Sequence, residues 1–188
     1  MRHYDTFESP YGQLLLLATN NGICGVYFKG QKYFPEQHGD RQRVPGHAIL
    51  KQAKQELAEY FTGKRRRFEV ALDPDGTAFQ RSVWNAISRV GFGETITYAM
   101  LAANAGHRGS ARAAGAATGR NPISIIVPCH RSMGATGSLT GYAGGLERKR
   151  ALLTLEGGLG KQVLAKKGRD PAVHLRKQRA VEAGRIVQ

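Results

Sequence analysis

The chain has 188 residues, of which 41% are hydrophobic, so it can fold as one ordinary globular domain or as two small ones. It contains no apolar run long enough to span a membrane and no signal-peptide-like start, and we therefore expect a cytoplasmic protein with no membrane partner. Lys and Arg number 28 against 14 Asp and Glu, and this net charge of +14 favours a polyanionic partner over a merely solvated basic surface.

The N-terminal part of the sequence predicts strands. We expect them over residues 3–7, 14–19 and 23–28, where apolar residues are concentrated. The Asn20-Asn21-Gly22 sequence between the last two is suited to a turn with positive φ, which predicts a β-hairpin. Residues 29–46 are polar and contain Gly and Pro, as is typical of a loop.

One helix is predicted next, because apolar residues recur at helical spacing from Ile49 to Phe61 and Gly63 is a natural stop. A further strand is expected over residues 68–72. The turn sequence Asp73-Pro74-Asp75-Gly76 then marks the boundary between residues 1–75 and 76–158, which we interpret as two domains.

Three helices are predicted after this boundary. Thr77 can cap the first, which carries an apolar face to Val90, and the others cover residues 97–105 and 110–118, with Ser110 as a second capping residue. A short glycine-containing turn joins the last two, a pattern typical of a helix-turn-helix.

The third helix consists almost entirely of small residues. Arg112 is its only long polar side chain, whereas a helix that reads the major groove needs several. The helix therefore suits either tight internal packing or a narrow minor groove. In the minor groove, a single arginine could enter the base stack and fill the space of an extruded base.

Residues 125–127 are apolar and predict a buried strand that ends at Pro128, followed by Cys129, His130 and Arg131. Two basic groups beside a thiol should raise its thiolate fraction, and thiolate is the nucleophilic form. A purely structural cysteine at a strand end is the alternative. The other cysteine, Cys24, lies among apolar residues and is interpreted as packing; both thiols are expected to be free.

The rest of the chain holds a glycine-rich loop, a helix and a basic extension. The loop, residues 134–145, lacks a phosphate-loop signature and is not interpreted as a nucleotide site. The helix is predicted over residues 147–155. Residues 159–188 form the basic C-terminal extension, which allows non-specific contact with DNA.

Together these motifs resemble the alkylguanine-DNA alkyltransferases, also called methylated-DNA–protein-cysteine methyltransferases. The matching segments, in the family's order through residues 77–158, are Phe79-Gln80-Arg81-Ser82-Val83-Trp84, Gly93-Glu94-Thr95-Ile96-Thr97-Tyr98, Ala111-Arg112-Ala113, Asn121-Pro122, Pro128-Cys129-His130-Arg131, Thr140-Gly141-Tyr142-Ala143-Gly144-Gly145-Leu146 and Leu155-Glu156-Gly157. The resemblance implies an α+β fold. A small N-terminal α/β domain with a short antiparallel sheet would precede a mainly α helix-turn-helix domain that carries the active-site cysteine.

The resemblance also implies catalytic roles. Cys129 would take the alkyl group from guanine O6, after His130 removes its proton through a water and Glu156 orients the histidine. Tyr98 would donate a proton to guanine N3, and Asn121 would position the thiol. Because the alkyl donor is DNA itself and the thioether is stable, no cofactor is expected and each molecule would act once.

The remaining implied residues contact DNA or line the substrate pocket. The DNA-binding residues are Arg112, which would fill the vacated stack, together with Ser110, Ala111, Ala113 and Thr97. The pocket residues are Tyr142, Ala143 through its amide, Gly144, Val127 and Ser132, with Lys149 nearby in an unassigned role. Some relatives bind zinc in the N-terminal domain, but Cys24 has no histidine at suitable spacing, so no metal is expected here.

The implied partner is double-stranded DNA containing O6-alkylguanine, bound by a protein that is monomeric in solution and able to bind DNA cooperatively. Three other readings remain. A damage-binding relative without catalysis is disfavoured by the presence of Cys129. A cysteine hydrolase would not need Arg112 on a small-residue helix, and a helix-turn-helix regulator would need a better base-reading helix.

Overall fold

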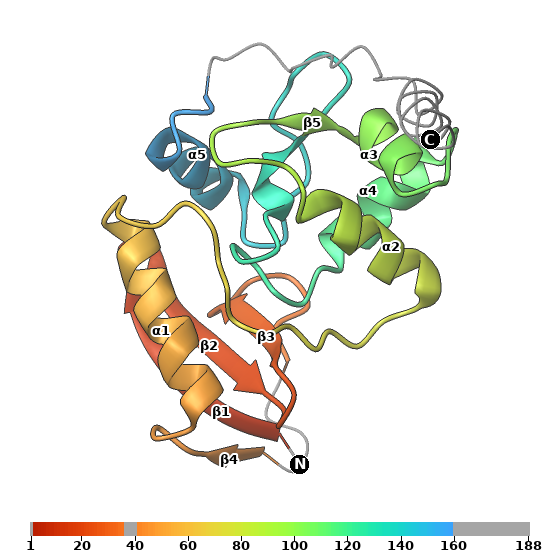
Figure 1. The fold of residues 1–188 in the computed structure, drawn as a ribbon. Coiled ribbons are helices and arrows are strands. Elements are labelled where there is room, and N and C mark those ends of the chain that lie inside the picture. The colour runs from red at the N-terminus through yellow and green to blue at the C-terminus, as the bar shows by residue number, and fades with distance from the viewer. Residues whose placement is uncertain (1, 36–40, 160–188) are drawn as a thin grey trace, which may run out of the picture.

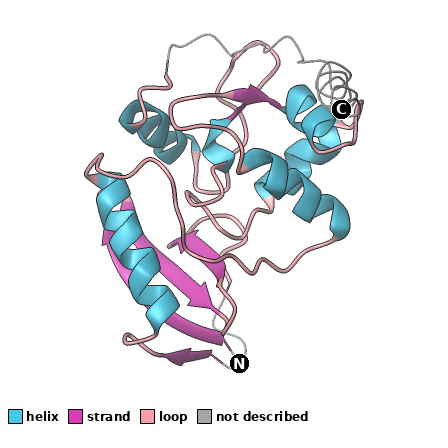
Figure 2. Ribbon diagram, in the orientation of Figure 1, coloured by secondary structure: helices cyan, strands magenta, loops and turns pink. Residues whose placement is uncertain are grey.

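The computed structural model describes residues 2–35 and 41–159, and the predicted basic extension lies almost wholly outside these ranges. An N-terminal sheet with one helix occupies the lower part of the molecule, and the remaining helices gather above it (Figures 1 and 2). This is the expected α+β arrangement, a small sheet part followed by a mainly helical part. Within the described residues no helix is long and apolar enough to cross a membrane.

The N-terminal sheet has four strands in the order β3-β2-β1-β4. Its antiparallel strands are β1 (Arg2–Ser9), β2 (Gly12–Ala18) and β3 (Ile23–Phe28), and β4 (Arg41–Arg43) pairs parallel with β1. The predicted hairpin of β2 and β3 is confirmed. Its turn has no positive φ, however: Gly22 is needed because a Cβ there would lie 2.7 Å from the carbonyl oxygen of Ala71.

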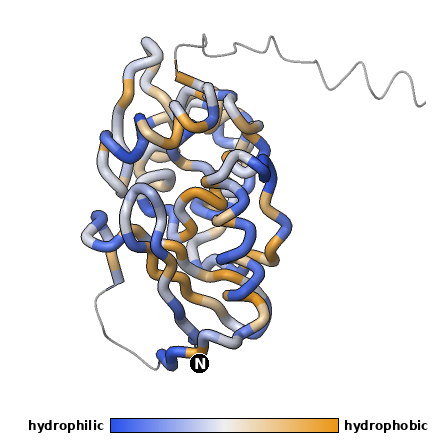
Figure 3. Tube along the Cα trace, turned by 90° about the vertical axis from the view of Figure 1, so that its left-hand side faces the viewer, coloured by the Kyte–Doolittle hydropathy of each residue, from blue (hydrophilic) through white to orange (hydrophobic). Residues whose placement is uncertain are grey.

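Helix α1 (Ala48–Phe61) packs against one face of this sheet (Figure 1). Its buried side chains recur at helical spacing, as the sequence predicted, and include Leu50, Leu57 and Tyr60. They meet the apolar side chains of β2 and β3. Figure 3 shows the hydrophobic stretches of the chain in this lower half of the molecule. The helix thus closes one side of the N-terminal core.

Two predictions for the N-terminal part are wrong. The loop expected over residues 29–46 contains β4, a short edge strand without an apolar pattern. The strand expected over residues 68–72 is extended chain with only an isolated bridge from Leu72 to Ile23. Its amides are satisfied differently, since the carboxylate of Glu56 accepts from the backbone of Glu69 at 2.8 Å and Val70 at 3.2 Å.

The C-terminal part completes the open edge of β3. The amide of Val26 donates to the Pro122 carbonyl at 2.8 Å, and the amide of Ser124 donates to Val26 at 3.0 Å. An uncovered edge would leave these backbone groups without partners. One continuous core therefore runs from the sheet to the segment just before Cys129.

The C-terminal part holds the predicted helices and one small sheet. Its helices are α2 (Ala78–Ile87), α3 (Tyr98–Asn104), α4 (Ala111–Gly119), the 3-10 helix η1 (Cys129–Arg131) and α5 (Leu146–Leu155). Strands β5 (Ile96–Thr97) and β6 (Ser132–Met133) pair parallel. Helices α3 and α4 pack together with a short turn between them, as the helix-turn-helix prediction required.

The predicted strand over residues 125–127 is wrong. These residues form a tight buried turn, with Ile125 in the left-handed region at φ 73°. Hydrogen bonds within the turn replace strand pairing, including those from the Ile126 amide to Ser124 at 2.9 Å and from the Val127 amide to Ile123 at 3.0 Å. An apolar run shows burial, but it does not distinguish a strand from a buried turn.

The N-terminus of α2 offers a test of the capping prediction. The Thr77 hydroxyl accepts from the Gln80 amide at 3.2 Å, and the Gln80 side chain accepts from the Thr77 amide at 2.9 Å. Replacing this exposed residue in Thr77→Ala should lower the free energy of unfolding by about 1 kcal/mol, measured by urea denaturation. Thr136→Ala, in an exposed loop outside any helix, is the control, and equal losses in both variants would contradict the capping role.

Candidate active site

Cys129 lies at the start of η1, where Pro128 ends the buried turn, and it is only 3% exposed. The side chain of Asn121 holds both the turn and the thiol. Its amide nitrogen donates to the Val127 carbonyl at 2.9 Å and lies 3.1 Å from Cys129 Sγ. Its oxygen accepts from the Ile123 amide at 3.0 Å. Asn121 therefore connects the end of α4 to the sulfur, which is the position expected for a residue that orients the thiol.

The thiol is not surrounded by positive charge as the sequence suggested. The guanidinium of Arg131 binds the Glu156 carboxylate and the Val90 carbonyl. Burial raises the pKa of the Cys129 thiol, although the Asn121 hydrogen bond and the Lys149 charge act in the opposite direction. The expected rise in thiolate fraction is therefore wrong, because desolvation outweighs nearby charge. The resting sulfur is protonated and needs a base.

His130 is the neighbouring base. Its Nε2 lies 2.9 Å from Glu156 Oε1, and both side chains are fully buried. A carboxylate can only accept, so Nε2 carries the proton and Nδ1 has a free lone pair. Nδ1 has no hydrogen-bond partner among the described residues. Burial lowers the pKa of His130 despite the carboxylate, so the imidazole is neutral and able to accept a proton.

The Glu156 carboxylate accepts five hydrogen bonds from residues that the structure describes. Oε1 accepts from His130, from Arg131 Nη2 at 2.8 Å and from the Tyr60 hydroxyl at 2.7 Å. Oε2 accepts from Arg131 Nε at 2.8 Å and from the Gly93 amide at 3.2 Å. Burial raises the pKa of Glu156, but the bonds from His130 and Arg131 outweigh it, and the net shift is strongly downward. The carboxylate is therefore ionised and held in one orientation.

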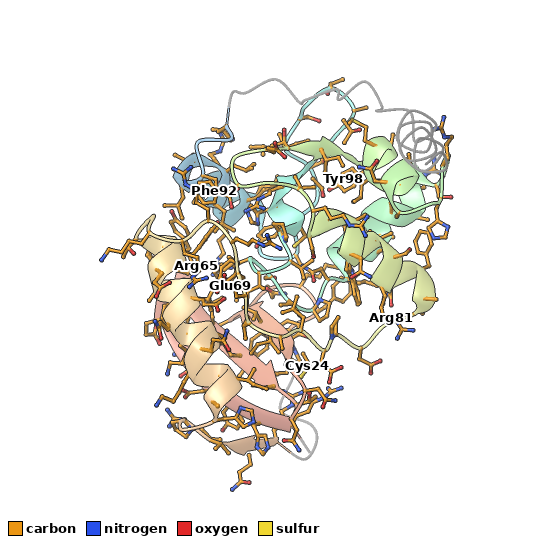
Figure 4. All side chains as sticks on the ribbon, viewed as in Figure 1. Cys24, Arg65, Glu69, Arg81, Phe92 and Tyr98 are labelled. Carbon is orange, nitrogen blue, oxygen red and sulfur yellow. The ribbon has the colours of Figure 1, made fainter. Side chains whose placement is uncertain are left out.

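Two tyrosines lie over the buried thiol region. Tyr98, at the start of α3, donates to the carbonyls of Thr140 and Gly141, both at 3.2 Å (labelled in Figure 4). The ring of Tyr142 lies edge-on to His130, with 6.4 Å between ring centroids. Burial raises the pKa of both phenols, so each keeps its proton. Among the described residues the Tyr142 hydroxyl has no hydrogen-bond partner.

Lys149 lies in α5, and its side chain is fully buried. It supports the loop that carries Tyr142. Its ammonium donates to the carbonyl of Thr140 at 2.6 Å and also to the carbonyls of Ser132 and Gly141. Burial lowers the pKa of Lys149 to about 8. The residue left without a role in the sequence therefore joins β6 to the loop beside Tyr98.

The other expected pocket residues lie around the same centre. Val127 and Ser132 flank η1 on either side and are buried. The carbonyl of Ala143 accepts from the Lys32 amide at 3.0 Å, which ties this loop to the N-terminal part. A Cβ at Gly144 would lie 2.6 Å from the Tyr142 ring, so only glycine lets that ring take its position.

The residues expected to contact DNA lie on α4, just before it and at the end of β5. Arg112 and Ala113 are exposed, whereas Ala114 and Ala117 on the opposite face are buried. The small residues of α4 thus serve internal packing on one face and leave the other open. Ser110 occupies the N-cap position, but its side chain makes no capping bond, so that part of the prediction is wrong.

The other two expected DNA contacts lie beside these residues. Ala111 begins α4 and is partly buried. Thr97 caps α3, because its hydroxyl accepts from the Met100 amide at 3.2 Å.

Sequence reasoning missed three groups of this site. Tyr60 was interpreted only as part of an apolar helix face, and the Gly93 amide carried no signal. Arg131 was placed beside the sulfur instead of the carboxylate. A buried charge at Glu156 requires several donors, but the sequence does not show which distant segments supply them.

The described residues contain no group of three or more His, Cys, Asp or Glu side chains that could hold a metal. Cys24 lies on the N-terminal sheet, far from the labelled Tyr98 in Figure 4, and its thiol is free like that of Cys129. Burial raises the pKa of Cys24, and the strand around it is tightly packed. Within the described residues, Cys129 is therefore the thiol whose neighbour in the chain is a histidine bonded to a carboxylate.

Two protein-family models match the chain. The model described as "6-O-methylguanine DNA methyltransferase, DNA binding domain" matches residues 78–158. The model described as "6-O-methylguanine DNA methyltransferase, ribonuclease-like domain" matches residues 2–74. Together they cover most of the chain, including the N-terminal part, for which the sequence motifs alone were not specific.

Curated relatives and solved structures agree with these matches. The methylated-DNA–protein-cysteine methyltransferase of Methanosarcina acetivorans is 46% identical, over 82% of this chain and 98% of that protein. The protein of the same name from Mycobacterium tuberculosis is 44% identical, over 83% of this chain and 93% of its own length.

The solved structure of M. tuberculosis OGT in complex with DNA has a TM-score of 0.75 at 44% identity, over 82% of this chain and 92% of that one. The chain therefore belongs to the 6-O-methylguanine DNA methyltransferase family, and it is a DNA-binding repair enzyme of the methylated-DNA–protein-cysteine methyltransferase class.

Proposed function

We propose that this protein repairs O6-alkylguanine in duplex DNA by transferring the alkyl group irreversibly to Cys129. The observation that carries the proposal is a pair of contacts at adjacent residues: the Asn121 amide lies 3.1 Å from the buried Cys129 sulfur, and the next residue, His130, is bonded to Glu156 at 2.9 Å. These groups supply an orienting donor, a neutral base and a fixed carboxylate. A thiol activated by a neighbouring base is a nucleophile that can attack the alkyl carbon directly.

The protonation states of the two groups support a thiol that gives up its proton to His130 during the reaction. The sulfur is protonated at rest, and His130 Nδ1 has a free lone pair in the tautomer fixed by Glu156. A water between the two would carry the thiol proton to Nδ1. The imidazolium that forms would then be stabilised by the Glu156 carboxylate, as in other nucleophile–base–acid triads.

The Cys129 sulfur forms a bond to the alkyl carbon while the bond from that carbon to O6 breaks, and the electron pair passes into the guanine ring. Tyr98, which is protonated, would donate to guanine N3 as negative charge develops and would regain a proton from the His130 imidazolium through water. The net transfer is one proton, from the thiol to the base, and exchange with solvent moves it from N3 to N1. The products are a thioether and an unmodified guanine. Nothing in the proposed chemistry reverses the thioether, so each molecule acts once.

The closed position of the sulfur supports base flipping. Cys129 is 3% exposed and lies inside the protein, and an O6 carbon within a stacked, paired base could not reach it in line. Helix α4 offers an exposed face of small residues with one long side chain, Arg112, which suits the minor groove. Arg112 would fill the space that the flipped base leaves. The other expected contacts would lie along the DNA backbone: Ser110, Ala111, Ala113 and Thr97.

The loop over residues 140–145 would form the wall of the base pocket. Tyr142 would pack on the flipped base, and the Ala143 amide would donate to O6, a backbone contact that does not depend on the side chain. Gly144, Val127 and Ser132 would complete the pocket. We further propose that Lys149 positions this loop, because its ammonium binds the carbonyls of Thr140 and Gly141.

The proposal includes the organisation and partners expected from the sequence. Residues 1–75 would form one domain and 76–158 the DNA-binding and catalytic domain, acting as a monomer in solution and cooperatively on DNA. A cytoplasmic location remains a prediction from the sequence alone.

Mass spectrometry of the intact protein tests the transfer. After incubation with a duplex containing O6-methylguanine, the protein should gain one methyl group, located on Cys129, because the thioether is stable. Cys129→Ser should gain none. Cys24→Ala removes the other buried thiol and is the matched control, which should still gain one methyl group. Transfer of more than one methyl per molecule, or none in the unmodified protein, would refute the proposal.

A second experiment tests the role of Arg112. Arg112→Ala should slow methyl transfer from duplex DNA by about tenfold, on the order of 1.4 kcal/mol, because the vacated stack is no longer filled. Transfer from the free O6-methylguanine base should be unchanged. Arg81→Ala removes an equal charge from the exposed face of α2 and controls for general attraction to DNA. Equal losses on duplex and free base would show that Arg112 does not act on flipping.

A further inference from the structure

Among the described residues, Tyr60 is the donor to Glu156 that comes from the N-terminal part. It lies on α1, 96 residues before Glu156 in the chain, and its hydroxyl reaches Oε1 at 2.7 Å. The other donors are His130, Arg131 and the Gly93 amide, which all belong to the C-terminal part. The mechanism proposed above gives this phenol no role.

The Tyr60 hydroxyl is held rigidly in place. The side chain is 0% exposed, and its ring packs against Phe61, Phe68 and Phe92, with centroid distances of 5.3, 5.4 and 6.1 Å. The ring of Phe92 also lies 6.0 Å from the guanidinium of Arg131. An aromatic cluster therefore aims one hydroxyl at the oxygen that His130 also uses.

We propose that Tyr60 is a positioning residue for alkyl transfer, which acts through Glu156 on His130. The inference rests on the proposed function, because it assumes that His130 is the base. By sharing Oε1, the Tyr60 hydroxyl fixes the carboxylate and limits the negative charge that Glu156 presents to the imidazole. The N-terminal part would thereby adjust the pKa of His130 without contacting DNA or substrate.

Several groups face His130, and only one of them changes when the hydroxyl is removed. The titratable and charged groups around the imidazole are Glu156 after α5, Arg131 and Cys129 in η1, Lys149 in α5, Tyr142 in the loop and, through Glu156, Tyr60 in α1. In Tyr60→Phe the ring and its packing remain. The carboxylate loses one donor to Oε1 and keeps the bonds from Arg131 and Gly93.

The sign of the effect follows from the charge on Oε1. With one donor fewer, Glu156 stabilises the imidazolium more strongly, and the pKa of His130 rises. When the pKa of His130 is higher, acidification protonates the imidazole sooner. The neutral form, which is the active base, is then lost at a higher pH. The acid limb of the transfer rate should therefore move to higher pH in Tyr60→Phe.

The experiment is a pH profile of single-turnover methyl transfer from an O6-methylguanine duplex to the full chain. For Tyr60→Phe we expect the acid limb to move up by about one pH unit, which makes transfer about tenfold slower at a pH below both limbs. Nitrogen chemical shifts of His130 in labelled protein should show the same upward movement. The chemical-shift measurement does not depend on methyl transfer, and it observes His130 in the folded protein directly.

Tyr11→Phe is the matched control. The Tyr11 hydroxyl also joins the N-terminal part to α5, at 3.5 Å from the Ala151 carbonyl, but it does not contact Glu156. It should leave the pH profile where it is. The inference is overturned if Tyr60→Phe keeps the unmodified profile and the unmodified His130 shifts, or if Tyr11→Phe moves both equally. A lack of transfer in the unmodified protein would instead refute the proposed function.

Discussion

A carboxylate can stay charged inside a protein only if donors replace the water that it loses, and the structure around Cys129 depends on this requirement at Glu156. Five hydrogen bonds reach the carboxylate, from the end of α1, the turn at Gly93 and η1. Removing any one donor leaves the buried charge less fully compensated, so all of these segments contribute to keeping Glu156 ionised. The histidine beside the thiol takes its orientation and tautomer from this arrangement.

Burial decides the chemical state of the site at rest. It raises the pKa of the Cys129 thiol and lowers that of His130, so both groups are neutral. A neutral, nearly inaccessible thiol reacts slowly with small electrophiles, because thiolate is the reactive form. Under the proposed single-use reaction, this low reactivity would protect the sulfur from other electrophiles.

The N-terminal part supports the site at several points although it carries none of the expected catalytic residues. The edge of β3 pairs with the segment that leads to Cys129, and the Lys32 amide holds the Ala143 carbonyl in the pocket loop. Tyr60 adds a direct bond to Glu156. One core runs through both parts, so a change at the sheet can reach the carboxylate through packed side chains.

The sequence alone predicted what depends on near neighbours in the chain. Thr77 caps α2, the hairpin of β2 and β3 is present, and the motif residues around Cys129 indicated the family. The prediction failed where one sequence pattern fits two structures. The apolar run over residues 125–127 fits both a buried strand and a buried turn, and it is a turn. Only the tertiary structure decided the charge state of the thiol, the direction of Arg131 and the contact of Tyr60. Desolvation and hydrogen bonding at Glu156 depend on groups 63 and 96 residues away, and spacing along the chain carries no record of such encounters.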